Sequence, residues 1–282
     1  MRFIIFGDSK GKDNGINKKV LNSLMKASSK LGPPAQFIVI CGDSVAGGKD
    51  SSILKRQLND FKSIICKYHG NIRLLPVIGN HEVNIVPKND LYEKEFKNFY
   101  DDMINDDTSL LNHNKTVYYT DFENIRLIIL NSFHYPYTHI VSQEQIYWLK
   151  EICKDCTKKK ILFVHSPLFP TGAHLGHCLD LYPDKRDILL AALIESKIDL
   201  VISGHEHNYS RRVISNINNN KYLMQVITGG GGEKLKDKYK SKDGIIIPPI
   251  PKFHYIIADS SSEEILFTVM DIKEKTIDKF SI

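Results

Sequence analysis

Five short apolar runs of this chain end on an aspartate, an asparagine or a histidine, and this pattern restricts the possible folds more than any other feature. The runs are "FIIFGD" at 3–8, "FIVICGD" at 37–43, "LLPVIGNH" at 74–81, "ILFVH" at 161–165 and "LVISGHEH" at 200–207. Such runs are typical of buried strands in an α/β sheet, and these sheets bind ligands beyond the carboxyl ends of their strands. We therefore expect the polar side chains at the five strand ends to form one site. They are Asp8, Asp43, Asn80, His81, His165, His205 and His207.

Amphipathic segments and hairpins separate these runs. Apolar residues recur at helical spacing in four segments, which are 16–32, 51–68, 142–153 and 187–198. Two further segments predict antiparallel hairpins, at 116–132 and 253–272. Residues 82–114 predict irregular structure, and residues 233–252 a long surface loop. The alternation predicts an α/β fold in which helices cover mixed sheets, and no Pro-, Gly- or Ser-rich linker divides it, so we expect one domain over 1–282.

Composition narrows the classes of partner. The net charge of +5 comes from lysines scattered along the chain, without interleaved aromatic residues, so no specific nucleic-acid binding is expected. No run reaches the roughly 18 apolar residues of a membrane-spanning helix, so no membrane association is expected. A strand begins at Phe3 and leaves no room for a signal peptide, which predicts a cytoplasmic protein, or a secreted one if a leader has been removed.

The residue types at the strand ends favour a metal site. They offer oxygen and imidazole ligands without thiolate, a set that suits divalent transition metal ions such as Mn, Fe, Zn, Ni or Co. Two clusters that share one bridging aspartate would hold two ions about 3.5–4 Å apart, which is the arrangement used for phosphoester hydrolysis. His205 and His207 alternate along an extended segment, so both face one site only if the chain turns after Gly204.

The order of these motifs resembles the calcineurin-like metallophosphoesterases. "GDS", "CGDS", "GNHE", "FVHSP" and "GHEH" follow one another as in that superfamily. "SQEQIYWL", "FVHSPLFPTGAH", "DLVISGHEHNYSRR" and "TGGGG" are similar to the purple-acid-phosphatase-like branch, bacterial type, and the likeness covers nearly the whole chain. The resemblance implies a four-layer αββα sandwich of two mixed sheets flanked by helices.

The resemblance also implies roles for single residues. Asp43 matches the aspartate that bridges two metal ions. The other matched ligands are Asn80, His165 and His205 for the second ion, and Asp8 and His207 for the first. His81 matches a histidine that stabilises the phosphoryl charge or protonates the leaving oxygen, and Glu82 is expected to orient it through a hydrogen bond. Asn80, His81 and His174 are expected to contact the substrate phosphate.

Two positions depart from the family pattern. Lys10 stands where most members have a histidine ligand of the first ion, and Ala46 stands where true purple acid phosphatases have a tyrosine ligand. The first ion therefore lacks one protein ligand and is expected to bind more weakly. Without the tyrosine, we expect no purple Fe(III) enzyme.

Three functional hypotheses remain from the sequence. The first is a metal-dependent phosphoester hydrolase in which a hydroxide that bridges two ions attacks phosphorus in line. Its substrate is a small molecule, a nucleotide or a phosphoprotein, as a monoester or a diester. The second is a weakly active or inactive binding scaffold, suggested by Lys10 and Ala46. The third is an enzyme with one ion, in which Lys10 contacts the phosphate directly.

Overall fold

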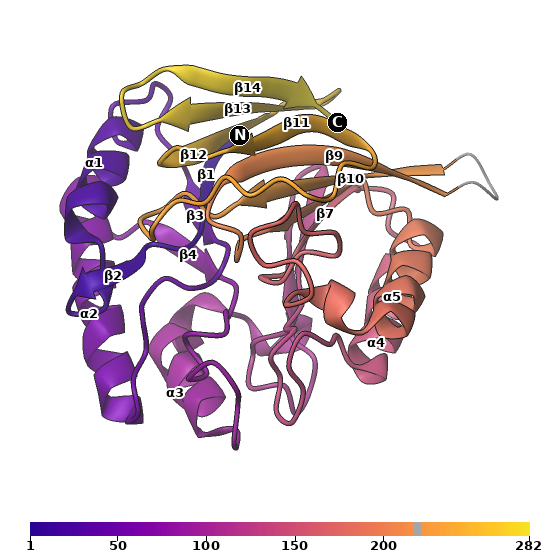
Figure 1. Ribbon diagram of the computed structural model, residues 1–282, viewed down its shortest axis with the longest axis horizontal. Coiled ribbons are helices and arrows are strands. Elements are labelled where there is room, and N and C mark those ends of the chain that lie inside the picture. Colours follow the sequence, from indigo (N-terminus) through magenta and orange to yellow (C-terminus); the bar gives the residue numbers. More distant parts are fainter. Residues whose placement is uncertain (217–220) are drawn as a thin grey trace.

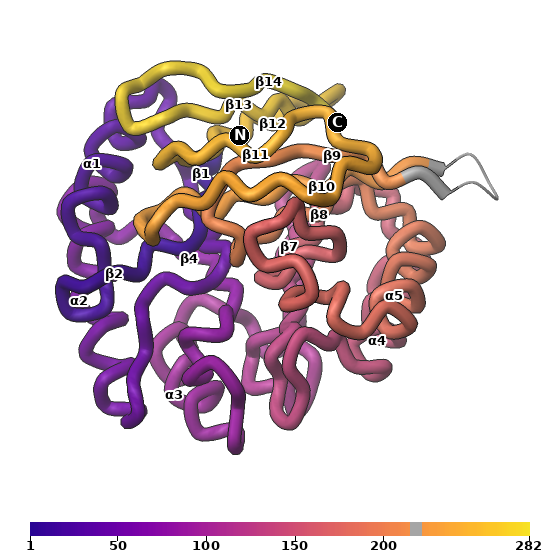
Figure 2. Tube along the Cα trace, viewed as in Figure 1, coloured from indigo at the N-terminus to yellow at the C-terminus, as the bar shows by residue number. Residues whose placement is uncertain are grey.

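Two mixed β-sheets face each other in the computed structural model, which describes residues 1–216 and 221–282. The first sheet has the order β14-β13-β12-β1-β3-β4. Its strands are β1 (Arg2–Phe6), β3 (Phe37–Ile40), β4 (Arg73–Pro76), β12 (His254–Ser260), β13 (Ile265–Asp271) and β14 (Thr276–Ser281). Strands β1, β3 and β4 are parallel, and β12 runs antiparallel to β1. Figure 2 shows both chain termini beside these C-terminal strands.

The second sheet has the order β11-β9-β10-β8-β7-β6-β5. Its strands are β5 (Tyr118–Phe122), β6 (Ile125–Ile129), β7 (Lys159–Phe163), β8 (Leu200–Ser203), β9 (Tyr209–Asn216), β10 (Lys221–Thr228) and β11 (Ile245–Ile250). Strands β6, β7, β8 and β10 are parallel. The short β2 (Lys10–Asp13) belongs to neither sheet and bridges to Ile16.

Helices cover the outer faces of the two sheets. They are α1 (Lys18–Ser28), α2 (Ser51–His69), α3 (Leu91–Tyr100), α4 (Gln143–Cys153) and α5 (Pro183–Glu195), with short 3₁₀ turns at Asp101–Met103, Asp106–Thr108 and Leu179–Leu181. Figure 1 shows α1 (indigo) and α2 (purple) on one side of the strands and α4 and α5 on the other. This arrangement confirms the predicted fold of two mixed sheets flanked by helices.

Aromatic side chains join the two sheets. Phe3 of β1 stacks on Phe37 of β3 with ring centroids 4.7 Å apart, and Phe37 stacks on Phe122 of β5 at 4.3 Å. All three belong to one apolar core, in which Phe3 and Phe37 are fully buried. Because stacked rings bury large apolar areas, this row fixes the spacing between the sheets.

Local sequence signals set most helix starts. The side chain of Asn17 accepts a hydrogen bond from Val20 N–H at the start of α1, and Ser142 accepts one from Gln145 N–H at the start of α4. Both predicted hairpins form, as β5–β6 and as β12–β13.

Two segments are more regular than the sequence predicts. Residues 82–114 contain α3, whose buried face carries Glu93 beside Phe96 and Tyr100. A buried glutamate breaks the apolar period by which a helix is found. Residues 233–252 contain β11, which pairs irregularly with β9 and alternates exposed and half-buried residues.

The topology brings the expected ligands to one edge. Asp8, Asp43 and Asn80 follow the parallel strands β1, β3 and β4 of the first sheet, while His165 and His205 follow the parallel strands β7 and β8 of the second. The carboxyl ends of parallel strands meet at one edge of a sheet, and here two such edges adjoin. No helix among the described residues is long and apolar enough to cross a membrane.

Candidate metal centre

Four side chains converge beyond β3, β4, β7 and β8. The carboxylate of Asp43 and the rings of His165 and His205 each offer an atom, and these atoms lie within 4.8 Å of one another. His205 Nδ1 lies 3.2 Å from His165 Nε2 and 3.0 Å from Asn80 Oδ1. We call Asp43, Asn80, His165 and His205 the four-ligand site.

Backbone carbonyls set the proton positions of the two rings. His165 Nδ1 lies 2.7 Å from the carbonyl oxygen of Cys41, and His205 Nε2 lies 2.9 Å from that of His177. A carbonyl only accepts, so each of these nitrogens carries a proton, and His165 Nε2 and His205 Nδ1 are the ring atoms that face the site. Metal-binding histidines have this outer hydrogen bond. The four-ligand site therefore fits a divalent ion.

The backbone at the site adopts conformations that are unfavourable for most residues. Asp8, Asp43 and His205 have positive φ angles of 61°, 50° and 68°. The positive φ at His205 is the turn after Gly204 that the sequence required. Gly42, with φ 83°, passes so close to His165 that a Cβ atom would lie 2.4 Å from its Nδ1 atom. Backbone strain of this kind, about 1–3 kcal/mol per residue, is typical of functional sites.

The first-ion position holds the side chain of Lys10. Its Nζ atom lies 2.8 Å from Asp43 Oδ2, 3.2 Å from His207 Nε2 and 3.5 Å from Asp8 Oδ1. We call this group of four residues the lysine site. An ion bound by the same three atoms at the usual distance of about 2.0–2.2 Å would have to share this space with the ammonium. The residues present therefore do not fit an ion while Lys10 keeps this position.

The lysine site combines one ammonium, two carboxylates and one neutral ring. Burial alone would lower the pKa of Lys10, but the carboxylates of Asp43 and Asp8 outweigh it and hold that pKa well above its usual value. Burial and the nearby Lys10 ammonium lower the pKa of His207 far below its usual value, so its ring is neutral. His207 Nδ1 donates to the carbonyl oxygen of Lys234 at 3.1 Å, which leaves Nε2 to accept from Lys10.

Glu82 has a different task from the one expected. We predicted that it orients His81, but His81 Nδ1 lies 3.0 Å from the carbonyl oxygen of Ala46 instead. Glu82 Oε2 accepts from the backbone N–H groups of Asp43 and Gly79, both at 2.9 Å. Its Oε1 atom accepts from the backbone N–H and the hydroxyl of Ser44, both at 2.7 Å. This buried carboxylate therefore holds the loop that carries Asp43.

Glu206 is a positioning residue that sequence reasoning missed. Its carboxylate accepts from the backbone N–H groups of Gly172 at 2.9 Å and His174 at 3.0 Å, and from Thr171 at 2.5 Å. It lies between His205 and His207, so one short segment supplies two site histidines and holds the loop of a third. The sequence signal for this role is the position of Glu206 between the two candidate ligands His205 and His207.

A pocket of about 300 Å³ opens onto both sites. His81 and His174 line it as expected, and so do Glu233 and Lys236, which the sequence did not single out. Lys236 Nζ lies 2.6 Å from His174 Nε2, so His174 accepts from an ammonium there. Burial and then Lys236 lower the pKa of His174 to about 4, which keeps its ring neutral.

Two further features lie close to the centre. The loop of Thr228–Gly232 passes beside it, since a Cβ atom on Gly229 would lie 3.0 Å from Asp8 Oδ2. His139 packs edge-on against His205 with ring centroids 5.4 Å apart. His134 Nδ1 lies 3.1 Å from the buried carboxylate of Glu93.

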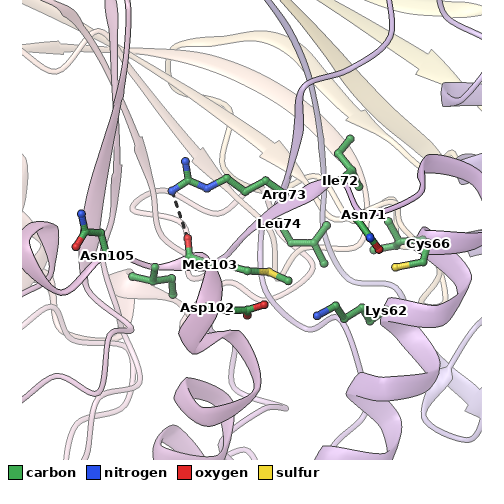
Figure 3. A pocket seen from close by; sticks show the side chains of 11 residues that line it. Lys62, Cys66, Asn71, Ile72, Arg73, Leu74, Asp102, Met103 and Asn105 are labelled. Carbon is green, nitrogen blue, oxygen red and sulfur yellow. Dashed lines mark hydrogen bonds between the residues drawn. The ribbon is translucent and has the colours of Figure 1, made fainter.

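A roomier cavity lies elsewhere, between α2, β4 and the 3₁₀ turn that follows α3. Figure 3 shows its lining, which includes Lys62, Cys66 and Arg73, in a volume of about 740 Å³. Arg73 donates to the carbonyl oxygen of Met103 at 3.2 Å. Its lining has one carboxylate, that of Asp102, and no histidine, so the smaller pocket is the better candidate for chemistry.

Comparison with known families assigns this chain to a family. The sequence profile described as Calcineurin-like phosphoesterase matches residues 1–209, which include all the candidate ligands of both sites. The chain belongs to the calcineurin-like phosphoesterase family. Members of this family hold divalent metal ions, in keeping with the donor atoms of the four-ligand site.

Individual relatives of this calcineurin-like phosphoesterase carry phosphatase names. It is 27% identical over 138 residues to Purple acid phosphatase 21 of Arabidopsis thaliana, a match that covers 47% of this chain and 30% of the relative. It is 24% identical over 220 residues to Serine/threonine-protein phosphatase CPPED1 of Mus musculus, covering 74% of this chain and 65% of the relative. The chain thus spans less than two thirds of the length of either relative.

A solved structure shows the same fold. The structure of purple acid phosphatase PPD1 from yellow lupin (Lupinus luteus) seeds superposes with a TM-score of 0.79 at 17% identity. The superposition covers all of this chain and 53% of the lupin chain. At this identity the likeness concerns the fold.

Metal binding to this calcineurin-like phosphoesterase is expected to stabilise it. Free Zn²⁺ or Mn²⁺ at about 100 times its Kd should raise the free energy of unfolding by about 2.7 kcal/mol, because the ion binds the folded chain alone. Thermal unfolding with and without the ion measures this. His165→Ala, which removes a ligand, should abolish the shift, and the exposed Lys12→Ala should keep it. An unchanged Tm with each of Mn²⁺, Zn²⁺, Co²⁺, Ni²⁺ and Fe²⁺ would count against the site.

Proposed function

We propose that this chain hydrolyses phosphoesters with the help of a divalent metal ion held by Asp43, Asn80, His165 and His205. The observation that carries the proposal is the convergence of these donor atoms beside a pocket with cationic walls. The phosphatase names of two relatives support the same reaction class. We further propose that residues 1–282 act as one metallophosphoesterase domain.

The ion's part in this reaction is general metal chemistry. When bound, it would polarise the phosphoryl group and lower the pKa of a water molecule, which then serves as the nucleophile for in-line attack on phosphorus. The chain's part is to hold the ligands in place, which Glu82 and the backbone carbonyls of Cys41 and His177 do. We propose Mn, Fe, Zn, Ni or Co as the ion, because the ligands are oxygen and imidazole.

His81 is the group that we propose to face the reacting phosphate. Its backbone N–H donates to Asp43 Oδ1 at 3.0 Å, which fixes the residue beside the shared aspartate. Because Nδ1 donates to the carbonyl oxygen of Ala46, Nε2 carries a proton only in the imidazolium form. In that form, Nε2 can donate to a phosphoryl oxygen or give its proton to the leaving oxygen. His81 lines the pocket, so a substrate can reach it.

Two ammonium groups make the pocket suitable for an anion. Lys10 and Lys236 both line it, and Lys236 is held by His174 at 2.6 Å. We propose that Lys236 contacts the substrate phosphate and that His174 positions it, which refines the phosphate contact expected of His174 itself. Asn80 Nδ2 is a further donor, since its Oδ1 atom faces His205.

A hydrolysis assay tests the proposed function. The chain is stripped of metal, reloaded with Mn²⁺, Zn²⁺, Co²⁺, Ni²⁺ or Fe²⁺ in turn, and assayed with para-nitrophenyl phosphate and with bis(para-nitrophenyl) phosphate. We expect turnover of at least one ester that depends on the added ion, and loss of turnover in His165→Ala. Hydrolysis that persists in His165→Ala would mean that the activity comes from a contaminant or another site.

The second candidate function is a binding scaffold without turnover. It is favoured by the Lys10 ammonium, which lies 2.8 Å from the carboxylate of Asp43 and so competes with a metal ion for that carboxylate. Under this hypothesis no ester is hydrolysed with any of the five ions, while the pocket still binds inorganic phosphate. Phosphate binding measured by calorimetry, next to a negative assay, would identify this case.

A further inference from the structure

We infer that the Lys10 ammonium permanently takes the place of the first metal ion. This chain therefore binds one ion, at the four-ligand site, whereas its resemblance to the family implies two. The ammonium lies 2.8 Å from the shared carboxylate of Asp43 and within 3.5 Å of Asp8 and His207, the other two expected ligands. This inference deepens the proposed function, and its catalytic meaning rests on that function.

The three groups around the ammonium are all acceptors. Asp8 and Asp43 present carboxylate oxygens, and His207 presents the lone pair of Nε2 because its Nδ1 proton points to Lys234. An ammonium has three N–H donors, and three acceptors lie near it here, at 2.8, 3.2 and 3.5 Å. The same acceptors that would coordinate an ion therefore surround a cation that belongs to the chain.

Lys10 is also held at its backbone. Its N–H donates to the carbonyl oxygen of Asp43 at 3.2 Å, and the residue bridges to Ile16 through β2. The side chain is only 5% exposed, so the folded chain encloses nearly all of it. An ion that entered the lysine site would displace a fixed charge from between two buried carboxylates.

A fixed ammonium changes what the first position can do. It cannot be lost to a chelator, and it donates hydrogen bonds where an ion would accept lone pairs. Its contact to Asp8, at 3.5 Å, is the longest of the three, so that N–H is the one available to a phosphoryl oxygen in the adjoining pocket. Lys10 would then stabilise the phosphate charge by direct contact.

Counting bound ions tests the inference without any substrate. Stripped chain is titrated with Zn²⁺ and, separately, with Mn²⁺ by calorimetry, and the dialysed product is analysed for metal. We expect one ion per chain. His207→Ala should keep that ion, because His207 belongs only to the lysine site, whereas His165→Ala should lose it. Two ions in the unaltered chain, or loss of the ion in His207→Ala with retention in His165→Ala, would overturn the inference.

Substitutions of Lys10 test the converse. Lys10→Met removes the charge and leaves Asp8, Asp43 and His207 to bind a second ion, and Lys10→His adds a ligand. We expect two ions in both, with the second bound at least tenfold more tightly in Lys10→His. The matched control Lys12→Met, two residues along β2 and exposed, should still bind one ion. Where a Lys10 variant fails to fold, the His207→Ala and His165→Ala pair still decides.

The outcomes separate this inference from the proposed function. One ion per chain with no hydrolysis of either ester would refute the function and leave the ammonium's position standing. Hydrolysis by a chain that holds two ions would refute the inference and leave the function standing. A single ion found by anomalous scattering between Asp8 and His207, with Lys10 turned away, would refute the inference as well.

Discussion

Replacing His81 with alanine is expected to lower kcat for ester hydrolysis by about 10²–10⁴, the range of positioned general acid catalysis. The reason is its place: its backbone donates to Asp43, its Nδ1 atom is engaged by Ala46, and its ring lines the pocket. Steady-state kinetics of the metal-loaded chain measures the effect. The metal content should stay nearly unchanged, because His81 is not part of the four-ligand site.

His69→Ala is the matched control for this substitution. His69 is a half-buried histidine at the end of α2, where its ring contacts Ser28 at 2.9 Å, and it does not line the pocket. We expect its kcat to stay within a factor of about two of the unaltered chain. If His81→Ala loses its metal together with its activity, His81 is a ligand and its assignment here is wrong.

The second large effect is expected from Glu82→Gln. One carboxylate oxygen becomes an NH₂ group, which turns a donor toward backbone N–H groups that now have no acceptor. Each buried group left unsatisfied costs about 1–3 kcal/mol, so two such groups lower the free energy of unfolding by about 2–6 kcal/mol. Denaturant unfolding of the metal-free chain measures this loss.

Glu82→Gln should also weaken metal binding, by about 10–100-fold, the usual effect of removing an outer hydrogen bond to a ligand. The loss is expected because Glu82 holds the backbone on which Asp43 sits. Glu151→Gln, on the exposed face of α4, makes the same chemical change in solvent and should alter neither quantity. Unchanged stability in Glu82→Gln would show that the loop is held by other contacts.

Much of the architecture followed from local patterns. Apolar runs predicted β1, β3, β4, β7 and β8, and helical spacing predicted α1, α2, α4 and α5. These patterns are visible because one face of each element is buried. The sequence pattern does not predict helix α3, because its buried face includes Glu93. The carboxylate of Glu93 contacts Asn131 and His134, which lie far along the chain from it.

The candidate ligands were also visible in the sequence, whereas the residues that hold them were not. A polar residue directly after an apolar run, such as Asp8 or Asp43, is recognised as a candidate ligand from its position at the end of a buried strand. Glu82 was named but given the wrong partner, and Lys236 lies in a segment without any apolar period. The contacts of Glu82 and Lys236 are made with residues that lie beside them only in the folded chain, so the sequence alone does not predict them.

The sequence by itself determined the chemical character of the centre, which is a set of oxygen and imidazole donors that follow buried strands. It named Lys10 as the departure from the family pattern, yet left three roles open for it. Only the tertiary structure shows where the Lys10 ammonium lies, because a long, flexible lysine side chain places its charge beside carboxylates that the fold brings within reach. Carboxylates that follow β1 and β3, and a histidine that follows β8, surround that tip only after both sheets have packed together.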